Sequence, residues 1–214
     1  MSTVPTDSPA LQRVSGAEMR QLYSVVILSG GKSSRMGVDK RTMLWRGRSL
    51  LQRIIDGFPA CDDLLLSVRD TETAVPAGTR SVVDRFPGAG PLAGVHAALS
   101  EMKHDVLFVT TCDAPLVDCR TAEALLPLLG EHDAVVPVSE DGYIHPLAAL
   151  YRRRVIDTAQ ERLLRGDRKM RAFAAALDTV YIDGRLLPYG DLTLANLNRP
   201  SDLDRLERDL ERLT

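Results

Sequence analysis

The chain has 214 residues, 44% of them hydrophobic and 26% charged, and a formal net charge of −2. This length fits one α/β domain around a single core, and the near-neutral charge argues against a dedicated DNA-binding surface, which carries a strong basic excess. No apolar stretch approaches the roughly 20 residues needed to span a bilayer, and three cysteines without C-x-x-C spacing indicate neither a zinc site nor a disulfide framework, so we expect a cytoplasmic protein.

The first 22 residues are polar, contain Pro5 and Pro9, and lack the apolar stretch of a secretory signal. We therefore expect residues 1–22 to be a flexible N-terminal extension and residues 23–214 to form one domain. No internal repeat or low-complexity stretch divides this domain.

Strands and helices are predicted to alternate along the domain. Short apolar runs indicate buried strands at 24–28, 64–68, 81–83, 106–109, 134–138 and 147–151. Apolar residues at helical spacing indicate helices near 49–58, 91–102, 119–129 and 153–164. A last helix is expected from Ser201, with Asp204 three residues on as in a capping box. The alternation predicts an α/β fold with a single doubly wound, mainly parallel sheet.

Ligands of doubly wound sheets bind outside the carboxyl ends of the strands, and the loop after the first strand reads LSGGKSSRMGVDK over residues 28–40. Adjacent glycines let backbone N–H groups approach an anion, and Lys32, Arg35 and Lys40 supply positive charge for phosphate oxygens. An ordinary strand-to-helix turn is the usual role of a Gly-Gly pair. Three cations within nine positions favour a triphosphate-binding loop instead.

Two other phosphate-binding motifs are excluded. Gly31-Lys32-Ser33 is similar to the end of a Walker A loop, but Val26 stands where that motif requires its first glycine. The glycines at 88, 90 and 94 follow the third predicted strand, whereas a dinucleotide fingerprint belongs to the first βαβ unit.

The same segment, residues 28–40, resembles the signature L-x-G-G-x-S-x-R-M-G-x-D-K of nucleotidyltransferases with a Rossmann-like sheet, and most of all the molybdenum cofactor guanylyltransferase family. Three later segments resemble that family's other motifs in the same order: GPLAG at 90–94, CDAP at 112–115 and NLNRP at 196–200. The resemblance spans about residues 24–210. It implies a Rossmann-like nucleotidyltransferase fold, with GTP and molybdopterin as substrates.

Two carboxylates are candidate metal ligands. Asp113 follows a predicted strand and precedes Pro115, and a carboxylate at that position is well placed to bind Mg²⁺ together with substrate phosphates. The resemblance implies that Asp113 holds Mg²⁺ and contacts the nucleotide, and that Asp84 contacts the nucleotide or a second metal. A turn or helix-capping role stays open for both residues.

The chemistry that the resemblance implies is in-line attack by the terminal phosphate of molybdopterin on the α-phosphorus of GTP, with pyrophosphate as the leaving group. Such transfers depend on positioning and charge neutralisation, so no nucleophilic side chain is required. We expect Arg35 and Lys40 to neutralise the charge that develops, which makes Arg35, Lys40 and Asp113 the candidate catalytic residues.

The nucleotide is expected to lie against Leu28, Ser29 and Gly30, together with Lys40, Asp84 and Asp113. Family members often carry Asn at the end of the second strand, where this chain has Ser67. A single hydroxyl cannot replace a bidentate amide. Selectivity for GTP over CTP is therefore left open, with backbone groups as the alternative source.

The acceptor is a large anion, and the resemblance implies that Arg168, Lys169, Asn196 and Asn198 bind it. A solvated helix face for the basic run and a turn for the two asparagines remain alternatives. His145, before Pro146, also matches the family, and we expect a structural or hydrogen-bonding role for it.

Three functions are weighed: the guanylyltransferase, a related enzyme that uses CTP or another phosphorylated acceptor, and a nucleotide-binding regulatory module without catalysis. Intact Arg35, Lys40 and Asp113 argue against the last of these, because a pure binder needs no full charge-neutralising set. Nucleic acid and membrane partners are not expected. A monomer with transient contacts to cofactor-delivery proteins is compatible with the sequence.

Overall fold

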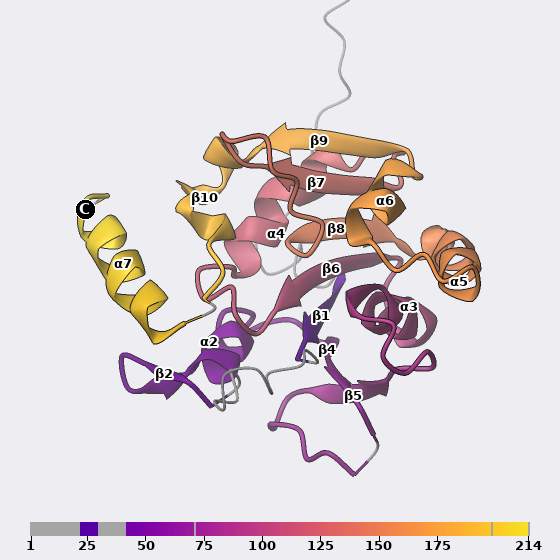
Figure 1. Ribbon diagram of the computed structural model, residues 1–214, viewed down its shortest axis with the longest axis horizontal. Helices are drawn as coiled ribbons and strands as arrows, with labels where there is room; N and C mark the ends of the chain where they lie inside the picture. Colours follow the sequence, from indigo (N-terminus) through magenta and orange to yellow (C-terminus); the bar gives the residue numbers. More distant parts are fainter. Residues whose placement is uncertain (1–21, 30–41, 71, 198, 214) are drawn as a thin grey trace, which may run out of the picture.

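A computed structural model describes residues 22–29, 42–70, 72–197 and 199–213. In this part of the chain, seven strands form one sheet in the order β5-β4-β1-β6-β8-β7-β9 (Figure 1). The strands are β1 (Ser24–Leu28), β4 (Leu64–Val68), β5 (Arg80–Val83), β6 (Val106–Thr111), β7 (Ala134–Val138), β8 (Ala149–Arg152) and β9 (Thr179–Asp183).

The sheet is mainly parallel, as the sequence predicts. β1 pairs in parallel with β4 and β6, β4 with β5, and β7 with β9. β8 runs antiparallel to both of its neighbours, β6 and β7. The strand expected at 147–151 therefore exists, but it begins two residues later and lies opposite in direction to the others.

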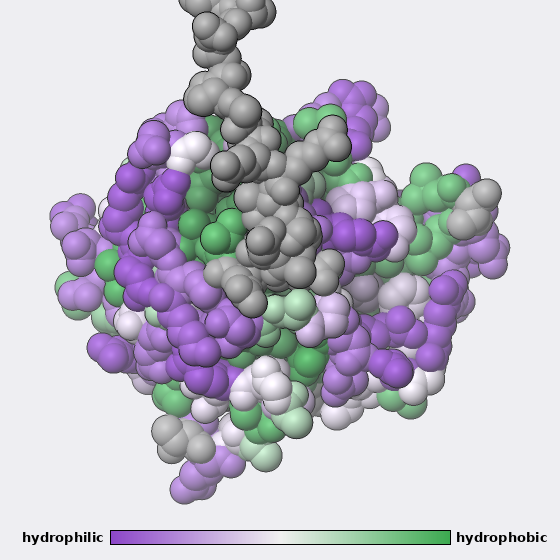
Figure 2. Space-filling model, turned by 180° about the vertical axis from the view of Figure 1, so that it is seen from behind, coloured by the Kyte–Doolittle hydropathy of each residue, from purple (hydrophilic) through white to green (hydrophobic). Residues whose placement is uncertain are grey.

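Helices cover both faces of the sheet, because the strand residues alternate between two apolar clusters. Val25 and Ile27 of β1 pack toward α2 (Leu50–Asp56) and α4 (Cys119–Leu125), which a 3₁₀ turn at Leu126–Leu128 extends. Val26 and Leu28 pack toward α3 (Pro91–Glu101), α5 (Ile156–Leu164) and α6 (Met170–Ala175), and a 3₁₀ turn at Arg153–Val155 leads into α5. Figure 2 shows hydrophilic residues over much of one face of the molecule, interrupted by smaller hydrophobic areas.

A third, smaller cluster lies beside the sheet, between a hairpin and the C-terminal helix. The hairpin consists of β2 (Leu44–Trp45) and β3 (Arg48–Ser49), joined by Arg46 and Gly47, which both have positive φ. The helix is α7 (Pro200–Glu211), preceded by a 3₁₀ turn at Gly184–Leu186, β10 (Pro188–Asp191) and a 3₁₀ turn at Leu192–Leu194. None of the described helices is both long and apolar enough to cross a membrane.

The start of α7 differs from the prediction. The helix begins at Pro200, a favourable first position, and the carboxylate that closes its first turn is Asp202 rather than Asp204. The Arg199 N–H donates a 2.8 Å hydrogen bond to Asp202 Oδ2. The expected cap at Ser201 was therefore wrong by two residues, because Pro200 is the first residue of the helix and Arg199 is its N-cap.

Candidate active site

Five of the predicted site residues lie along the carboxyl edge of the parallel strands. Leu28 ends β1 and Ser29 follows it, while Ser67 pairs directly with Leu28 across the β1–β4 register. Asp84 follows β5 and Asp113 follows β6, and β6 pairs directly with β1. The fold therefore brings the nucleotide-side residues to one edge of the sheet, as expected for a doubly wound architecture.

The ends of β1 and β4 are tied together by side chains. The Ser29 hydroxyl donates a 2.5 Å hydrogen bond to the Ser67 carbonyl oxygen. Helix α3 approaches both strands closely at Gly94, where an added Cβ would lie 2.8 Å from Leu28 Cδ2 and 2.8 Å from Ser67 Oγ. Ser67 is only 7% exposed. Glycine is therefore required in α3 to let the helix lie against the two strand ends.

Asp113 connects β6 to a distant part of the chain. Its Oδ1 accepts a 2.6 Å hydrogen bond from Thr111 Oγ1, which orients the carboxylate at the strand end. Its main-chain carbonyl accepts a 2.8 Å hydrogen bond from the Leu197 N–H. The segment containing Asn196 is thereby held beside the CDAP segment, so two of the sequence motifs meet in space.

Asp84 has the local contact of a turn residue. Its Oδ1 accepts a 2.9 Å hydrogen bond from the Phe86 N–H. Burial raises the pKa of the Asp84 carboxyl, while the Phe86 hydrogen bond and nearby His96 act in the opposite direction. The turn alternative thus has a contact that supports it, and binding of nucleotide or metal by Asp84 stays a prediction.

The predicted acceptor residues that the structure describes, Arg168, Lys169 and Asn196, line one cleft of about 330 Å³. Ala114, next to Asp113, and Pro91, at the start of α3, line it as well. Arg168 Nη1 donates a 3.1 Å hydrogen bond to the Gly88 carbonyl, which connects the basic run to the loop before α3. The cleft therefore begins directly beside Asp113.

The loop between β7 and β8 contributes several residues to the lining of this cleft. Tyr143 and His145 line it, and the Arg171 guanidinium lies 3.7 Å from the centroid of the Tyr143 ring. His145 Nε2 is 3.0 Å from Ser139 Oγ. Burial lowers the pKa of His145 below its ordinary value, so the ring is mainly neutral at pH 7. These contacts agree with a hydrogen-bonding role for His145.

Sequence reasoning had assigned no site role to Tyr143, and it had noted Gly94 only as part of the GPLAG motif and of the excluded dinucleotide pattern. Tyr143 lies in a polar loop with no motif, and in the cleft it contacts Arg171, which is 28 residues away in the sequence. The glycine pattern at 88–94 is visible in the sequence, but the contact of Gly94 with β1 and β4 exists only after folding.

Four predicted site residues, Gly30, Arg35, Lys40 and Asn198, lie outside the described residues. Among the residues that are described, no group of three or more His, Cys, Asp and Glu side chains could hold a metal ion. A site built on Asp113 has a chemistry that fits Mg²⁺, because this ion prefers oxygen ligands and is commonly bound by one or two carboxylates plus substrate phosphates.

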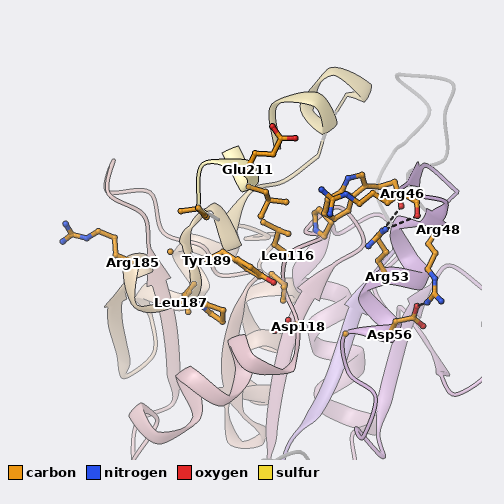
Figure 3. Close-up of a pocket in the computed structure, with 18 residues that line it drawn as sticks. Arg46, Arg48, Arg53, Asp56, Leu116, Asp118, Arg185, Leu187, Tyr189 and Glu211 are labelled. Carbon is orange, nitrogen blue, oxygen red and sulfur yellow. Dashed lines mark hydrogen bonds and ion pairs between the residues drawn. The ribbon is translucent and has the colours of Figure 1, made fainter. Parts of the chain in front are cut away.

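A larger cavity of about 1010 Å³ lies between the hairpin, α7 and β10 (Figure 3). None of the described residues predicted for nucleotide or acceptor lines it. Its basic side chains are largely paired, since Arg46 contacts Glu207, Arg48 contacts Asp56 and Arg185 contacts Asp183. We therefore locate the candidate active site at the carboxyl edge of the sheet and in the smaller cleft.

Comparison with known proteins finds relatives of this chain both in sequence and in structure. Residues 25–180 match the family described as MobA-like NTP transferase domain. A relative from Bacillus licheniformis named "Probable molybdenum cofactor guanylyltransferase" is 35% identical over 195 residues, which cover 88% of this chain and 97% of the relative. The molybdenum cofactor guanylyltransferase of Pseudomonas entomophila is 34% identical, with 84% of this chain and 95% of the relative covered. The crystal structure of molybdopterin-guanine dinucleotide biosynthesis protein A from Archaeoglobus fulgidus has a TM-score of 0.72 at 26% identity, and the match covers 88% of this chain and 99% of that chain.

Proposed function

Because the chain belongs to the MobA-like NTP transferase family, we propose that it transfers GMP from GTP to the terminal phosphate of molybdopterin and releases pyrophosphate. The product is the guanine dinucleotide form of the molybdenum cofactor. The names of the relatives support a guanylyltransferase over an enzyme that uses CTP.

The observation that carries the proposal is the position of Asp113 between two binding regions. On one side lie the carboxyl ends of β1, β4 and β5, where we assign the nucleotide. On the other side begins the basic cleft with Arg168, Lys169 and Asn196, where we assign the acceptor. A transferred phosphorus atom must meet both substrates, and the carboxylate stands where the two regions join.

We assign Asp113 as the residue that would hold Mg²⁺ against the triphosphate. When bound, this ion supplies positive charge that neutralises phosphate oxygens and orients the group under attack. Thr111 holds the Asp113 carboxylate in place through its hydroxyl, 2.6 Å from Oδ1. Arg35 and Lys40 are assigned to charge neutralisation on sequence grounds alone.

The acceptor cleft offers the groups that a phosphorylated pterin needs. Lys169 carries positive charge for the phosphate, and Arg168 adds charge while bonded to the Gly88 carbonyl. The Tyr143 ring and the Asn196 amide offer an aromatic surface and hydrogen-bonding groups for a planar heterocycle. We place the reaction in the cytoplasm, since Cys61, Cys112 and Cys119 are free thiols.

Pyrophosphate release tests the proposal. The protein is incubated with molybdenum-loaded molybdopterin, Mg²⁺ and either GTP or CTP, and the dinucleotide product is identified by mass spectrometry. We expect release with GTP that depends on the acceptor. Faster release with CTP would make this a cytidylyl enzyme, and binding of GTP without release in the presence of acceptor would make it a regulatory module.

A further inference from the structure

The small cluster beside the sheet, here called the C-terminal cluster, joins several segments that carry predicted site residues. Its buried members are Met43, Trp45, Leu50, Leu116, Leu197 and Leu206. Leu116 lies three residues after Asp113, and Leu197 directly follows Asn196. The cluster therefore packs the segments on both sides of the Asp113–Leu197 contact against α7 and the hairpin.

One carboxylate fastens α7 to the hairpin. Glu207 Oε1 accepts a 3.0 Å hydrogen bond from Trp45 Nε1 and a 3.2 Å hydrogen bond from Arg46 Nε. Leu206, the preceding residue of α7, is 2% exposed and fills the cluster. Figure 3 shows the cavity that this contact borders, with Arg46 and Arg53 on one side and Arg185 on the other.

The hairpin side of the contact is itself fixed to α2. Arg53 Nε donates a 2.8 Å hydrogen bond to the Trp45 carbonyl, and its guanidinium lies 4.5 Å from the centroid of the indole ring. The Leu50 N–H donates to the Met43 carbonyl at 2.9 Å. These contacts hold Trp45 of β2 against α2, and Glu207 ties α7 to Trp45.

We propose that Glu207 is a positioning residue for the transfer reaction. Because Glu207 fastens α7 to Trp45, it determines where Leu197 packs beside α7. The hydrogen bond from the Leu197 N–H to the Asp113 carbonyl then determines where the segment that carries Asp113 lies. The catalytic part of this inference rests on the proposed function. A displacement of about 1 Å at a reacting centre can lower turnover by roughly 10²-fold, so a contact distant from the chemistry can control the rate.

Trp45 provides a direct readout because it is the only tryptophan of the chain. Its side chain is buried and its indole N–H is bonded to Glu207, so its fluorescence emission reports whether α7 is seated. Three variants are compared with the wild type. Glu207→Ala removes both hydrogen bonds, Glu207→Gln keeps a carbonyl oxygen for the indole N–H, and Asp204→Ala removes an exposed carboxylate from the same helix as the control.

We expect Glu207→Ala to shift the emission of Trp45 to longer wavelength and to lower kcat by about 10- to 100-fold, with a much smaller change in the calorimetric Kd for GTP. Glu207→Gln should keep the wild-type emission and most of the activity, and Asp204→Ala should change neither. Thermal melts confirm that each variant is folded.

Two results overturn the inference. An unchanged emission in Glu207→Ala shows that Glu207 does not hold Trp45, whatever the enzyme does. A shifted emission with wild-type kcat shows that the contact is structural only. If the wild type itself forms no dinucleotide product, the proposed function fails, and with it the catalytic part of the inference, while the emission data still decide whether Glu207 seats α7.

Discussion

Asp113 uses its side chain and its main chain for different contacts, and this separates its two candidate roles. The carboxylate is oriented by Thr111, whereas the carbonyl oxygen anchors Leu197. A substitution that keeps the main chain and the size of the side chain therefore leaves the anchor intact. Only the charge is removed.

Asp113→Asn is expected to abolish Mg²⁺-dependent pyrophosphate release while the protein stays folded. An amide keeps one carbonyl oxygen for Thr111 but loses the charge that holds a hard divalent ion against phosphates. A Mg²⁺ titration of activity is measured together with a thermal melt. Activity at ordinary Mg²⁺ with an altered melt would make Asp113 structural and Asp84 the better metal candidate.

Gly94→Ala tests the close approach of α3 to the strand ends. The new Cβ would lie 2.8 Å from both Leu28 Cδ2 and Ser67 Oγ. We expect a loss of about 1–3 kcal/mol in the free energy of unfolding, as for other overpacked sites, together with weaker GTP binding.

The matched control is the double variant Gly94→Ala with Ser67→Ala. Removal of the hydroxyl should recover part of the lost stability in a double-mutant cycle of urea unfolding. Purely additive losses would show that Ser67 does not limit the approach of α3.

At the scale of elements, strands with continuous burial were predictable, whereas the edge strand β9 and the two strands of the hairpin were not. β1 and β4 are buried at every position, so their apolar runs stand out in the sequence. In β9, an edge strand, only Ile182 is buried, and each strand of the hairpin has two residues. Such segments are too short or too polar to show a period, and their structure comes from tertiary contacts.

The direction of β8 could not be predicted from the sequence either. An apolar run indicates a buried strand, but it carries no sign of whether its neighbours are parallel. Likewise, strand-end carboxylates such as Asp113 could be predicted from the run before them. The partners of Asp113 and Arg168, which are 84 and 80 residues away in the sequence at Leu197 and Gly88, could not.

The start of α6 supplies a prediction for the acceptor. Arg168 and Lys169 directly precede this helix and line the cleft. Arg168→Ala combined with Lys169→Ala should raise KM for molybdopterin and leave the Kd for GTP nearly unchanged. Steady-state kinetics and calorimetry measure the two quantities, with Arg165→Ala, on the exposed end of α5, as the control. An equal loss of GTP affinity would place the two residues on the nucleotide side.

At the scale of the whole molecule, Asp63 joins segments at the amino end of the sheet. Its carboxylate accepts hydrogen bonds from Ser24 Oγ at 2.5 Å, the Lys103 N–H at 2.7 Å and Arg80 Nη2 at 2.7 Å. Burial alone would raise the pKa of Asp63, but these hydrogen bonds outweigh burial and lower it. The charged form is therefore favoured in the folded state.

Asp63→Asn should lower the free energy of unfolding by about 3 kcal/mol at pH 7, because charge-assisted hydrogen bonds are lost at a buried site. A depressed carboxyl pKa stabilises the fold above the unfolded pKa of about 3.9 and ceases to do so as the pH falls through the folded value. The difference between wild type and variant in urea unfolding should thus shrink below pH 4. A difference that stays constant from pH 7 to pH 3 would contradict this reading.

The reversed direction of β8 has a consequence for how this protein can diversify. Because β8 returns antiparallel to β7, the connecting residues 139–148 lie at the same edge as the Asp113 carboxylate, and they form much of the cleft that we assign to the acceptor. The predicted nucleotide residues that the structure describes lie elsewhere, at or just after the ends of β1, β4, β5 and β6. Changes in length or sequence within 139–148 can therefore accumulate without disturbing the residues assigned to the base and triphosphate. Under the proposed function, the acceptor that is bound can therefore change while the nucleotide donor stays the same.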